Sequence, residues 1–358
     1  MNFTFLNDTY GESVVLAVGG GVVGCLFGFF AQRSRFCLRA AVIEFWHRQF
    51  GEKLSVWLLT FATAVIAIQA LTVLGALDVS SARQLATRGS LSGALIGGLL
   101  FGAGMVMTRG CASRLLVLSA TGNLRALLSG LIFAVTAQSS LSGALAPWRE
   151  RLSALWTVDA GPSRDVLALL GWTHTTGLWI GVLWLLAALY FTTRTTQRAW
   201  MWLGGIGTGL SVALAWWWSF QVAHASFEVV PLQGITFSGP SADWLMRVIA
   251  PNPPGLNFDF GLLPGVFLGA FASACWGHEL RLEGFKDGYS MRRYIAGAML
   301  MGFGAMLAGG CAVGAGVTGG AIFALTAWLA LAGMWVGAGI IDRWLDAPPR
   351  SAPTLIQP

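Results

Sequence analysis

The sequence has few charged residues for its length. Only 11% of its 358 residues are Asp, Glu, Lys or Arg, whereas a soluble domain carries about 25–35% charged residues on its surface. A water-soluble domain is therefore excluded. The five cysteines are an odd number and form no C-x-x-C pair, which argues against a disulfide framework and a thioredoxin-type redox site. The N-terminal segment before the first apolar run contains no basic residue, so we expect no cleavable signal peptide.

What the chain does contain is long apolar runs. It is 55% hydrophobic, with a mean hydropathy of +0.67. Runs of about 17–25 apolar residues, the length that crosses a hydrocarbon core, recur throughout. We predict an all-α polytopic membrane protein with about nine transmembrane helices. The predicted spans are 13–31, 54–77, 91–108, 124–145, 173–191, 199–219, 261–277, 290–308 and 321–341.

The basic residues predict an orientation. Lys and Arg of a membrane protein concentrate in cytoplasmic loops, so the net charge of +6 at pH 7 is no sign of nucleic-acid binding. The loop over 32–53 is rich in basic residues, which predicts a cytoplasmic position for it, an external N-terminus and a cytoplasmic C-terminus. Arg83 and Arg88, on a predicted outer loop, oppose this orientation. The basic residues of the 32–53 loop are Arg33, Arg35, Arg39, Arg48 and Lys53.

Two apolar runs are interrupted in matching ways. Residues 105–121 read MVMTRGCASRLLVLSAT, and residues 306–320 read MLAGGCAVGAGVTGG. Aligning Cys111 with Cys311 also aligns the glycines before them. A pair of glycine-interrupted segments in corresponding halves of a membrane protein points to a transport site. We predict two short re-entrant helices that face each other near the middle of the bilayer.

The spans also predict an internal repeat. The span before Cys111 and the span before Cys311 cross the membrane in opposite directions, which implies an inverted pseudo-two-fold repeat within one transmembrane domain, 1–358. Span five is left over as a connector. The predicted parts are a first repeat 13–145, a connector 146–198, a second, inverted repeat 199–341 and a cytoplasmic tail 342–358.

The broken segments suit an anion. The N-terminus of a short helix presents free N–H groups and a favourable dipole to negative charge. Gly110 and Gly310 allow close approach of a bound group. Arg109 and Arg114 flank Cys111, where they either steer an anion or hold the short helix in place. Glycines elsewhere in the spans have a simpler explanation, which is close packing of helices.

The cysteines divide by their setting. A neutral thiol donates a weak hydrogen bond and has a polarizable sulfur, so it binds a sulfur anion without preventing release. Cys111 and Cys311 lie at the two interruptions and are predicted to be functional. Cys25 and Cys275 lie inside ordinary spans and are interpreted as small buried residues. For Cys37, chemistry alone leaves both interpretations open.

Three short motifs together resemble the YeeE/YedE family of sulfur-compound transporters. They are Phe36-Cys37, Gly110-Cys111-Ala112 and Gly310-Cys311-Ala312. The resemblance implies an hourglass-shaped protein of the bacterial inner membrane that imports thiosulfate. It also implies that the thiols of Cys37, Cys111 and Cys311 pass the ion along by S–H hydrogen bonds, with Cys311 nearest the outer mouth. A separate TusA-like sulfur carrier is an implied cytosolic partner.

Two further classes of function stay open. A membrane thiol oxidoreductase requires two cysteines with Cα atoms within about 7 Å, and no two of the five are adjacent in sequence. A channel or scaffold would use the glycines for packing alone, and some relatives handle other sulfur or selenium species. His224 and Glu228 have helical i, i+4 spacing, but two ligands are too few for structural zinc. We predict a transporter rather than an enzyme, with no catalytic residue, metal or cofactor.

Overall fold

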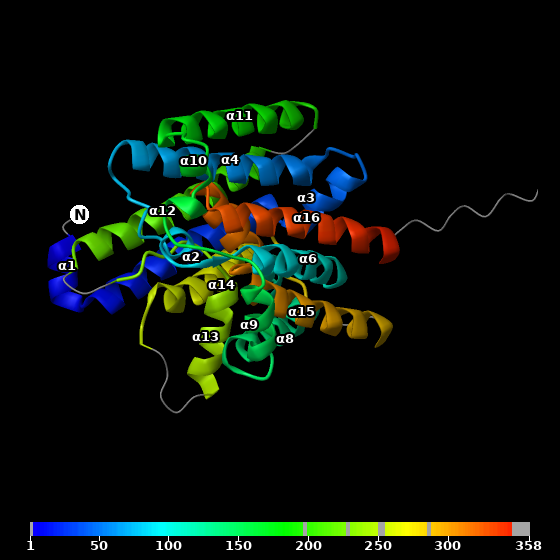
Figure 1. Cartoon of the computed structure of the whole chain (residues 1–358). Coiled ribbons are helices and arrows are strands. Elements are labelled where there is room, and N and C mark those ends of the chain that lie inside the picture. Colours follow the sequence, from blue (N-terminus) through cyan, green and yellow to red (C-terminus); the bar gives the residue numbers. More distant parts are fainter. Residues whose placement is uncertain (1–2, 196–198, 227–229, 250–254, 285–287, 346–358) are drawn as a thin grey trace, which may run out of the picture.

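The computed structural model describes residues 3–195, 199–226, 230–249, 255–284 and 288–345. Nearly all of this part of the chain is helical, and the long helices form one bundle (Figure 1). The long helices are α2 (Glu12–Ser34), α4 (Glu52–Val73), α6 (Leu91–Met107), α8 (Leu124–Ser142), α11 (His174–Thr193), α12 (Ala199–His224), α14 (Phe258–Trp276), α15 (Gly288–Ala308) and α16 (Leu325–Leu345). The shorter ones are α1 (Phe3–Tyr10), α3 (Leu38–Trp46), α5 (Arg83–Ala86), α7 (Ala112–Ala120), α9 (Ala146–Ala154), η1 (Pro162–Arg164), α10 (Val166–Leu169), α13 (Ser238–Ile249) and the π-helix η2 (Ala312–Gly319).

Nine segments within the described ranges are long and apolar enough to cross a membrane. Each predicted span coincides with one long helix, which confirms the all-α polytopic fold. Some ends differ by several residues. The last span was predicted to begin at 321, but α16 begins at Leu325, because Phe323 adopts a left-handed φ of 56° and turns the chain just before it.

Glycine contacts bring the central helices close together. α2 lies against α14, and α6 contacts both α15 and α16. A Cβ added at Gly98 or Gly102 of α6 would overlap a backbone carbonyl oxygen of α16, at Ala330 and Met334 respectively. Small residues permit this approach of helix backbones in membranes. The α6 glycines therefore serve packing, as expected for glycines outside the interruptions.

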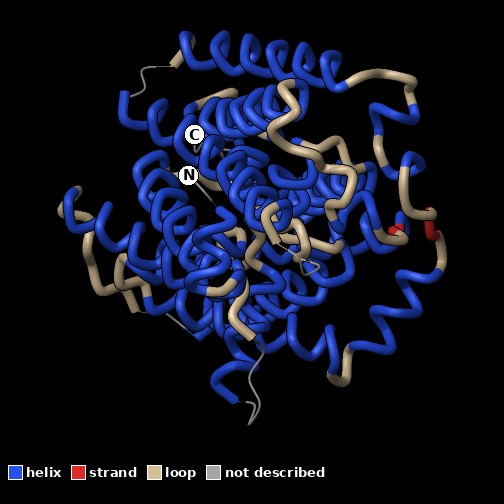
Figure 2. Tube along the Cα trace, turned by 90° about the vertical axis from the view of Figure 1, so that its left-hand side faces the viewer, coloured by secondary structure: helices blue, strands red, loops and turns tan. Residues whose placement is uncertain are grey.

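Span five, α11, lies at the edge of the bundle. It packs on α4, and Figure 1 shows it along the top of the molecule. Of the nine spans among the described residues it is the least buried. Figure 2 shows two short strands together at another edge of the trace. They are β1 (Gly89–Ser90) and β2 (Thr157–Val158), which pair antiparallel with Gly89 opposite Val158.

The loop predicted over 32–53 contains a helix, α3. Its Leu38, Ala41 and Val42 are buried, and this 1-4-5 spacing is that of an amphipathic helix with one apolar face. The prediction of a loop relied on the arginines around this segment and did not detect its apolar face. A short helix, α13, lies between spans six and seven.

The repeat remains a prediction. No measured feature of the fold tests the division into 13–145, 146–198 and 199–341. The predicted tail 342–358 begins inside α16, which continues to Leu345, and residues 346–358 lie outside the described part of the chain.

Candidate functional site

Three cysteines share one local geometry. Cys37, Cys111 and Cys311 each immediately precede a short helix, respectively α3, α7 and η2. Two residues before each cysteine the backbone turns through a left-handed φ, which ends the preceding long helix. Each thiol therefore lies beside the free N–H groups of a helix N-terminus. The left-handed residues are Arg35 at 53°, Arg109 at 57° and Gly309 at 77°.

Two of the thiols form a pair. The side chains of Cys37 and Cys111 interact with each other, although they belong to different helix breaks. Both are buried and neither is in a disulfide. The Cys111 Sγ also lies 3.4 Å from the hydroxyl oxygen of Ser113, in the first turn of α7. The spacing of cysteines in the sequence argued against such a pair, and only the folded chain reveals it.

The third thiol has backbone partners. Cys311 Sγ accepts hydrogen bonds from the N–H of Phe237, at 3.3 Å, and of Gly314, at 3.4 Å. Cys311 is completely buried. The loop before α13 covers it and is tied to η2 by a 2.6 Å bond from the Thr318 hydroxyl to the carbonyl of Ile235. α7 and η2 contact each other, so the two predicted re-entrant helices do meet.

An aromatic side chain lies between the two thiol positions. The fully buried Phe27 ring is 5.4 Å from the ring of Phe237, whose N–H binds Cys311. It is also 6.4 Å from the ring of Phe36, the neighbour of Cys37. Phe27 thus bridges the surroundings of Cys311 and those of the Cys37–Cys111 pair.

A polar cluster borders the thiol pair. Arg114, partly buried on α7, interacts electrostatically with both thiols. Its Nη1 donates to Gln32 Oε1 at 3.2 Å, and Gln32 Nε2 donates to Glu279 Oε2 at 2.7 Å. Arg35 Nη2 lies 3.6 Å from Glu279 Oε1. One glutamate therefore balances two arginines, which leaves positive charge beside the thiols.

The other predicted site residues are positioned differently. Arg109 is exposed and supplies the left-handed turn, so its side chain does not join the polar cluster in the way that Arg114 does. Gly110 and Gly310 are both buried. A Cβ at Gly310 would lie 2.9 Å from the backbone nitrogen of Ala315, whereas one at Gly110 would be 3.4 Å from its nearest neighbour. Only Gly310 is sterically required.

Cys25 and Cys275 take no part in this arrangement. Both are free cysteines with exposed side chains on the long helices α2 and α14. The expectation that they are buried was wrong, because an apolar span gives no indication of which face meets the bundle. Their lack of any role at the thiol site agrees with the interpretation as ordinary span residues.

Sequence reasoning missed three residues near the thiols, which are Phe27, Gln32 and Phe237. It interpreted a fourth, Glu279 at the end of span seven, as an ordinary anchor at the membrane interface. Gln32 gave a usable signal, since a polar side chain at the end of an apolar span is uncommon and marks functional positions. The two phenylalanines gave none, because they resemble any other apolar residue of a span.

This arrangement can bind a small anion containing sulfur. It offers thiol donors, helix N-termini and an arginine, all within a buried region. Among the described residues, no group of three or more His, Cys, Asp or Glu side chains could hold a metal ion.

Comparisons with known proteins point the same way. Residues 33–340 match the model of the family described as Sulphur transport. The chain is 31% identical over 345 residues to the thiosulfate transporter TsuA of Spirochaeta thermophila, an alignment that covers 90% of this chain and 98% of the relative. It is 23% identical to TsuA of Escherichia coli over 350 residues, or 91% of this chain and 95% of the relative. A probable transporter YedE of Salmonella typhimurium is 38% identical over 89 residues, 24% of this chain and 22% of that protein.

Proposed function

Because this chain belongs to the Sulphur transport (YeeE/YedE) family, we propose that it imports thiosulfate or a closely related sulfur anion into the cytoplasm across the bacterial inner membrane. It is a multi-pass membrane transporter for a sulfur compound, not an enzyme. The named relatives that align along nearly their whole length are thiosulfate transporters, which supports thiosulfate as the substrate.

The observation that carries this proposal is the repeated position of Cys37, Cys111 and Cys311. Each thiol stands at the N-terminus of a short helix inside the bundle. A thiol donates a weaker hydrogen bond than a charged side chain, so an anion bound by it is released readily. The positive helix ends compensate for the removal of the anion from water.

The proposed path begins at Cys311, which is nearest the outer mouth. The Cys311 thiol donates its S–H to the anion, while its sulfur accepts from the N–H groups of Phe237 and Gly314. Movement of the Phe27 ring then opens the way to Cys111 and Cys37. Arg114 attracts the anion to this second position, and Glu279 competes for Arg114 and so favours release toward the basic end of the molecule.

Uptake of labelled thiosulfate by cells without another uptake route tests the proposal. Alanine in place of Cys111 or Cys311 should reduce uptake at least ten-fold, with unchanged amounts of protein in the membrane. Cys25→Ala and Cys275→Ala are the matched controls and should retain uptake within two-fold, because those thiols are remote from the site. Normal uptake by both Cys111→Ala and Cys311→Ala would refute the proposed path.

Serine variants distinguish hydrogen bonding from covalent sulfur exchange. A serine hydroxyl keeps a donor at the same position but cannot form a mixed disulfide. Cys111→Ser should therefore transport more thiosulfate than Cys111→Ala. Equal and complete loss in both variants would favour covalent exchange. Parallel assays with sulfate and selenite establish which anion is preferred.

The cytosolic acceptor in this proposal is a separate TusA-like sulfur carrier. The basic end of the transporter, where Arg35 and Arg48 are exposed, is the surface from which it would receive the imported sulfur. Copurification of such a carrier with the membrane protein would support this partner.

A further inference from the structure

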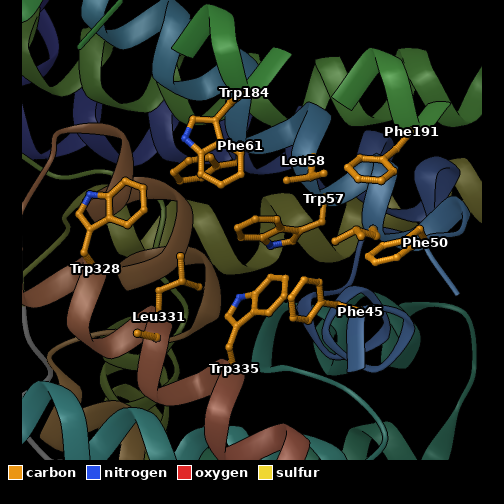
Figure 3. Close-up of a pocket in the computed structure, with 12 residues that line it drawn as sticks. Phe45, Phe50, Trp57, Leu58, Phe61, Trp184, Phe191, Trp328, Leu331 and Trp335 are labelled. Carbon is orange, nitrogen blue, oxygen red and sulfur yellow. The ribbon is translucent and has the colours of Figure 1, made fainter. Parts of the chain in front are cut away.

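A cavity lies away from the thiols. It has a volume of about 390 Å³ and is bounded by α3, α4, α11 and α16. Figure 3 shows its aromatic lining, with Trp184 and Trp328 toward one end and Phe50 and Phe191 toward the other. Its volume falls within the range of about 300–1,000 Å³ that is typical of ligand sites. The transport path does not use it.

The wall of this cavity consists of apolar and aromatic side chains alone. Trp57 stacks on Phe61 with ring centroids 5.3 Å apart, and Trp328 meets Phe61 edge-on at 5.6 Å. The indole nitrogens of Trp57 and Trp328 are buried without a hydrogen-bond partner. A hydrocarbon chain suits this interior, whereas a polar ligand would lose its hydration without compensation.

The cavity has a closed end and an open end. At the closed end, Trp57 and Phe61 are 3% and 1% exposed, whereas Phe45 and Phe50 at the other end are 43% and 42% exposed. The ring of Phe191 stacks on Phe50 at 5.5 Å and completes this open end. An occupant therefore enters past Phe45 and Phe50 and extends toward Phe61.

Three arginines are close in sequence to residues at the open end. Arg48 is two residues from Phe50, and Arg194 is three residues from Phe191 at the end of α11. The Arg343 guanidinium lies 5.1 Å from the ring of Trp46, which is adjacent to Phe45. All three arginines are exposed, and in the described part of the chain none of them forms an ion pair with a carboxylate.

The nearby carboxylates already have hydrogen-bond or ion-pair partners. Glu44 accepts the backbone N–H groups of Lys53 and Leu54, both at 2.9 Å. Asp342 lies 2.6 Å from the His47 ring, and Glu52 pairs with Lys53 at 3.8 Å. An apolar interior with a positively charged mouth is complementary to an amphiphile with a negative head.

We propose that this cavity binds one acyl chain of an anionic phospholipid, whose headgroup is held by Arg48, Arg194 and Arg343. α11 then has a definite role, because its Trp184 and Phe191 close the side of the cavity. The inference concerns a lipid site separate from the thiols, and it holds whichever sulfur anion is transported.

The bound chain stabilises the segment behind Cys311. Phe61 lies against Gly320, at the end of η2, where an added Cβ would be 3.0 Å from the ring. Trp328 stacks on Phe323, with ring centroids 6.1 Å apart. Filling the closed end of the cavity therefore restricts the turn that follows the re-entrant π-helix.

Thermal unfolding of the full-length protein in detergent tests the site. The probes are phosphatidylglycerol and phosphatidylcholine with identical acyl chains. Phosphatidylglycerol should raise Tm more than phosphatidylcholine, and it should slow amide hydrogen exchange over residues 312–324. Equal effects of the two lipids on the wild-type protein would overturn the proposal.

Variants separate the acyl site from the headgroup site. Ala332→Phe and the bulkier Ala332→Trp place a ring in the cavity from an exposed position on α16 and should abolish most of the response to phosphatidylglycerol. Leu183→Trp, on the exposed face of α11, is the matched control and should respond like the wild type. A full response in both Ala332 variants would contradict the site.

The arginine variants test the headgroup. Each of Arg48→Gln and Arg194→Gln should weaken the apparent affinity for phosphatidylglycerol roughly five-fold, as expected for one basic residue near an anionic lipid, without changing the response to phosphatidylcholine. Arg151→Gln, on the distant helix α9, is the control. Wild-type preference for phosphatidylglycerol in the double variant of Arg48 and Arg194 would overturn the assignment of the headgroup.

Discussion

At the scale of single residues, the two arginines that flank Cys111 have different surroundings. Arg114 is partly buried and interacts with Gln32 and both inner thiols, whereas Arg109 is exposed and determines a turn. A charge in a region of low polarity acts on its neighbours more strongly than a solvated charge does. Arg114 is therefore the arginine expected to act on a transported anion.

We expect Arg114→Gln to reduce thiosulfate uptake about ten-fold, a loss of ~1.4 kcal/mol in apparent binding, because an anion at the thiol pair loses its cation. Arg114→Lys keeps the charge and should retain more uptake. Arg109→Gln, the matched control, should remain within two-fold of the wild type. The measurement is the concentration dependence of labelled uptake, and a larger defect in Arg109→Gln than in Arg114→Gln would contradict this assignment.

At the scale of secondary-structure elements, the breaks depend on left-handed residues two positions before the cysteines. Glycine occupies that position before Cys311, but arginine occupies it before Cys37 and Cys111. A left-handed conformation costs a non-glycine residue roughly 1–2 kcal/mol. The break at Gly309 is therefore the unstrained one of the three.

Opposite substitutions at two of these positions should change stability differently. Gly309→Ala introduces a left-handed cost of about 1 kcal/mol and should lower Tm by about 2 °C. Arg109→Gly removes that cost, and the greater freedom of glycine in the unfolded chain offsets part of the gain, about 0.5–1 kcal/mol. Its Tm should be unchanged or higher. A decrease in Tm for Arg109→Gly that matches the decrease for Gly309→Ala would count against this account.

The sequence predicted two of the three breaks. Glycine beside a cysteine within an apolar run identified the interruptions at Cys111 and Cys311. The break before Cys37 was not predicted, because Arg35 adopts the left-handed conformation without any glycine. The arginine-rich stretch after it was then predicted as a loop rather than as α3.

Contacts between distant elements were beyond the sequence. The contact between Cys37 and Cys111 depends on how α3 and α7 are placed in the bundle, and no local pattern encodes it. Trp216 belongs to a run of three tryptophans, which is typical of a membrane interface, but it is completely buried and lies against Gly234 in the loop that covers η2. Hydropathy gives span length and number, but not the depth or the face of a side chain.

At the scale of the whole molecule, the two ends of the bundle differ in charge. The end that carries α3 and the start of α4 exposes several basic side chains, among them Arg35 and Arg48. The opposite end carries β1 and β2, with Arg88 within 3.9 Å of Asp159. The positive-inside rule assigns the first end to the cytoplasm, and the Arg88–Asp159 pair reduces the conflict raised by Arg88.

Labelling of introduced cysteines tests this orientation. In a background with Cys25→Ala and Cys275→Ala, an impermeant maleimide should label Asp159→Cys in intact cells. It should label Arg48→Cys only after the membrane is permeabilised, because the proposed orientation places that residue on the cytoplasmic side. The reverse pattern would invert the proposed orientation and with it the order of the thiols along the path.

The contact between Cys37 and Cys111 limits how many ions the proposed path would hold. Two anions at such close thiols would repel each other, so we expect the inner half to hold a single ion. One more can wait at Cys311 behind the ring of Phe27. We therefore expect ions to move through the protein in single file, with at most two bound at once. Uptake should then reach a plateau as the external substrate concentration increases, whereas uptake through an open pore would rise in proportion to it.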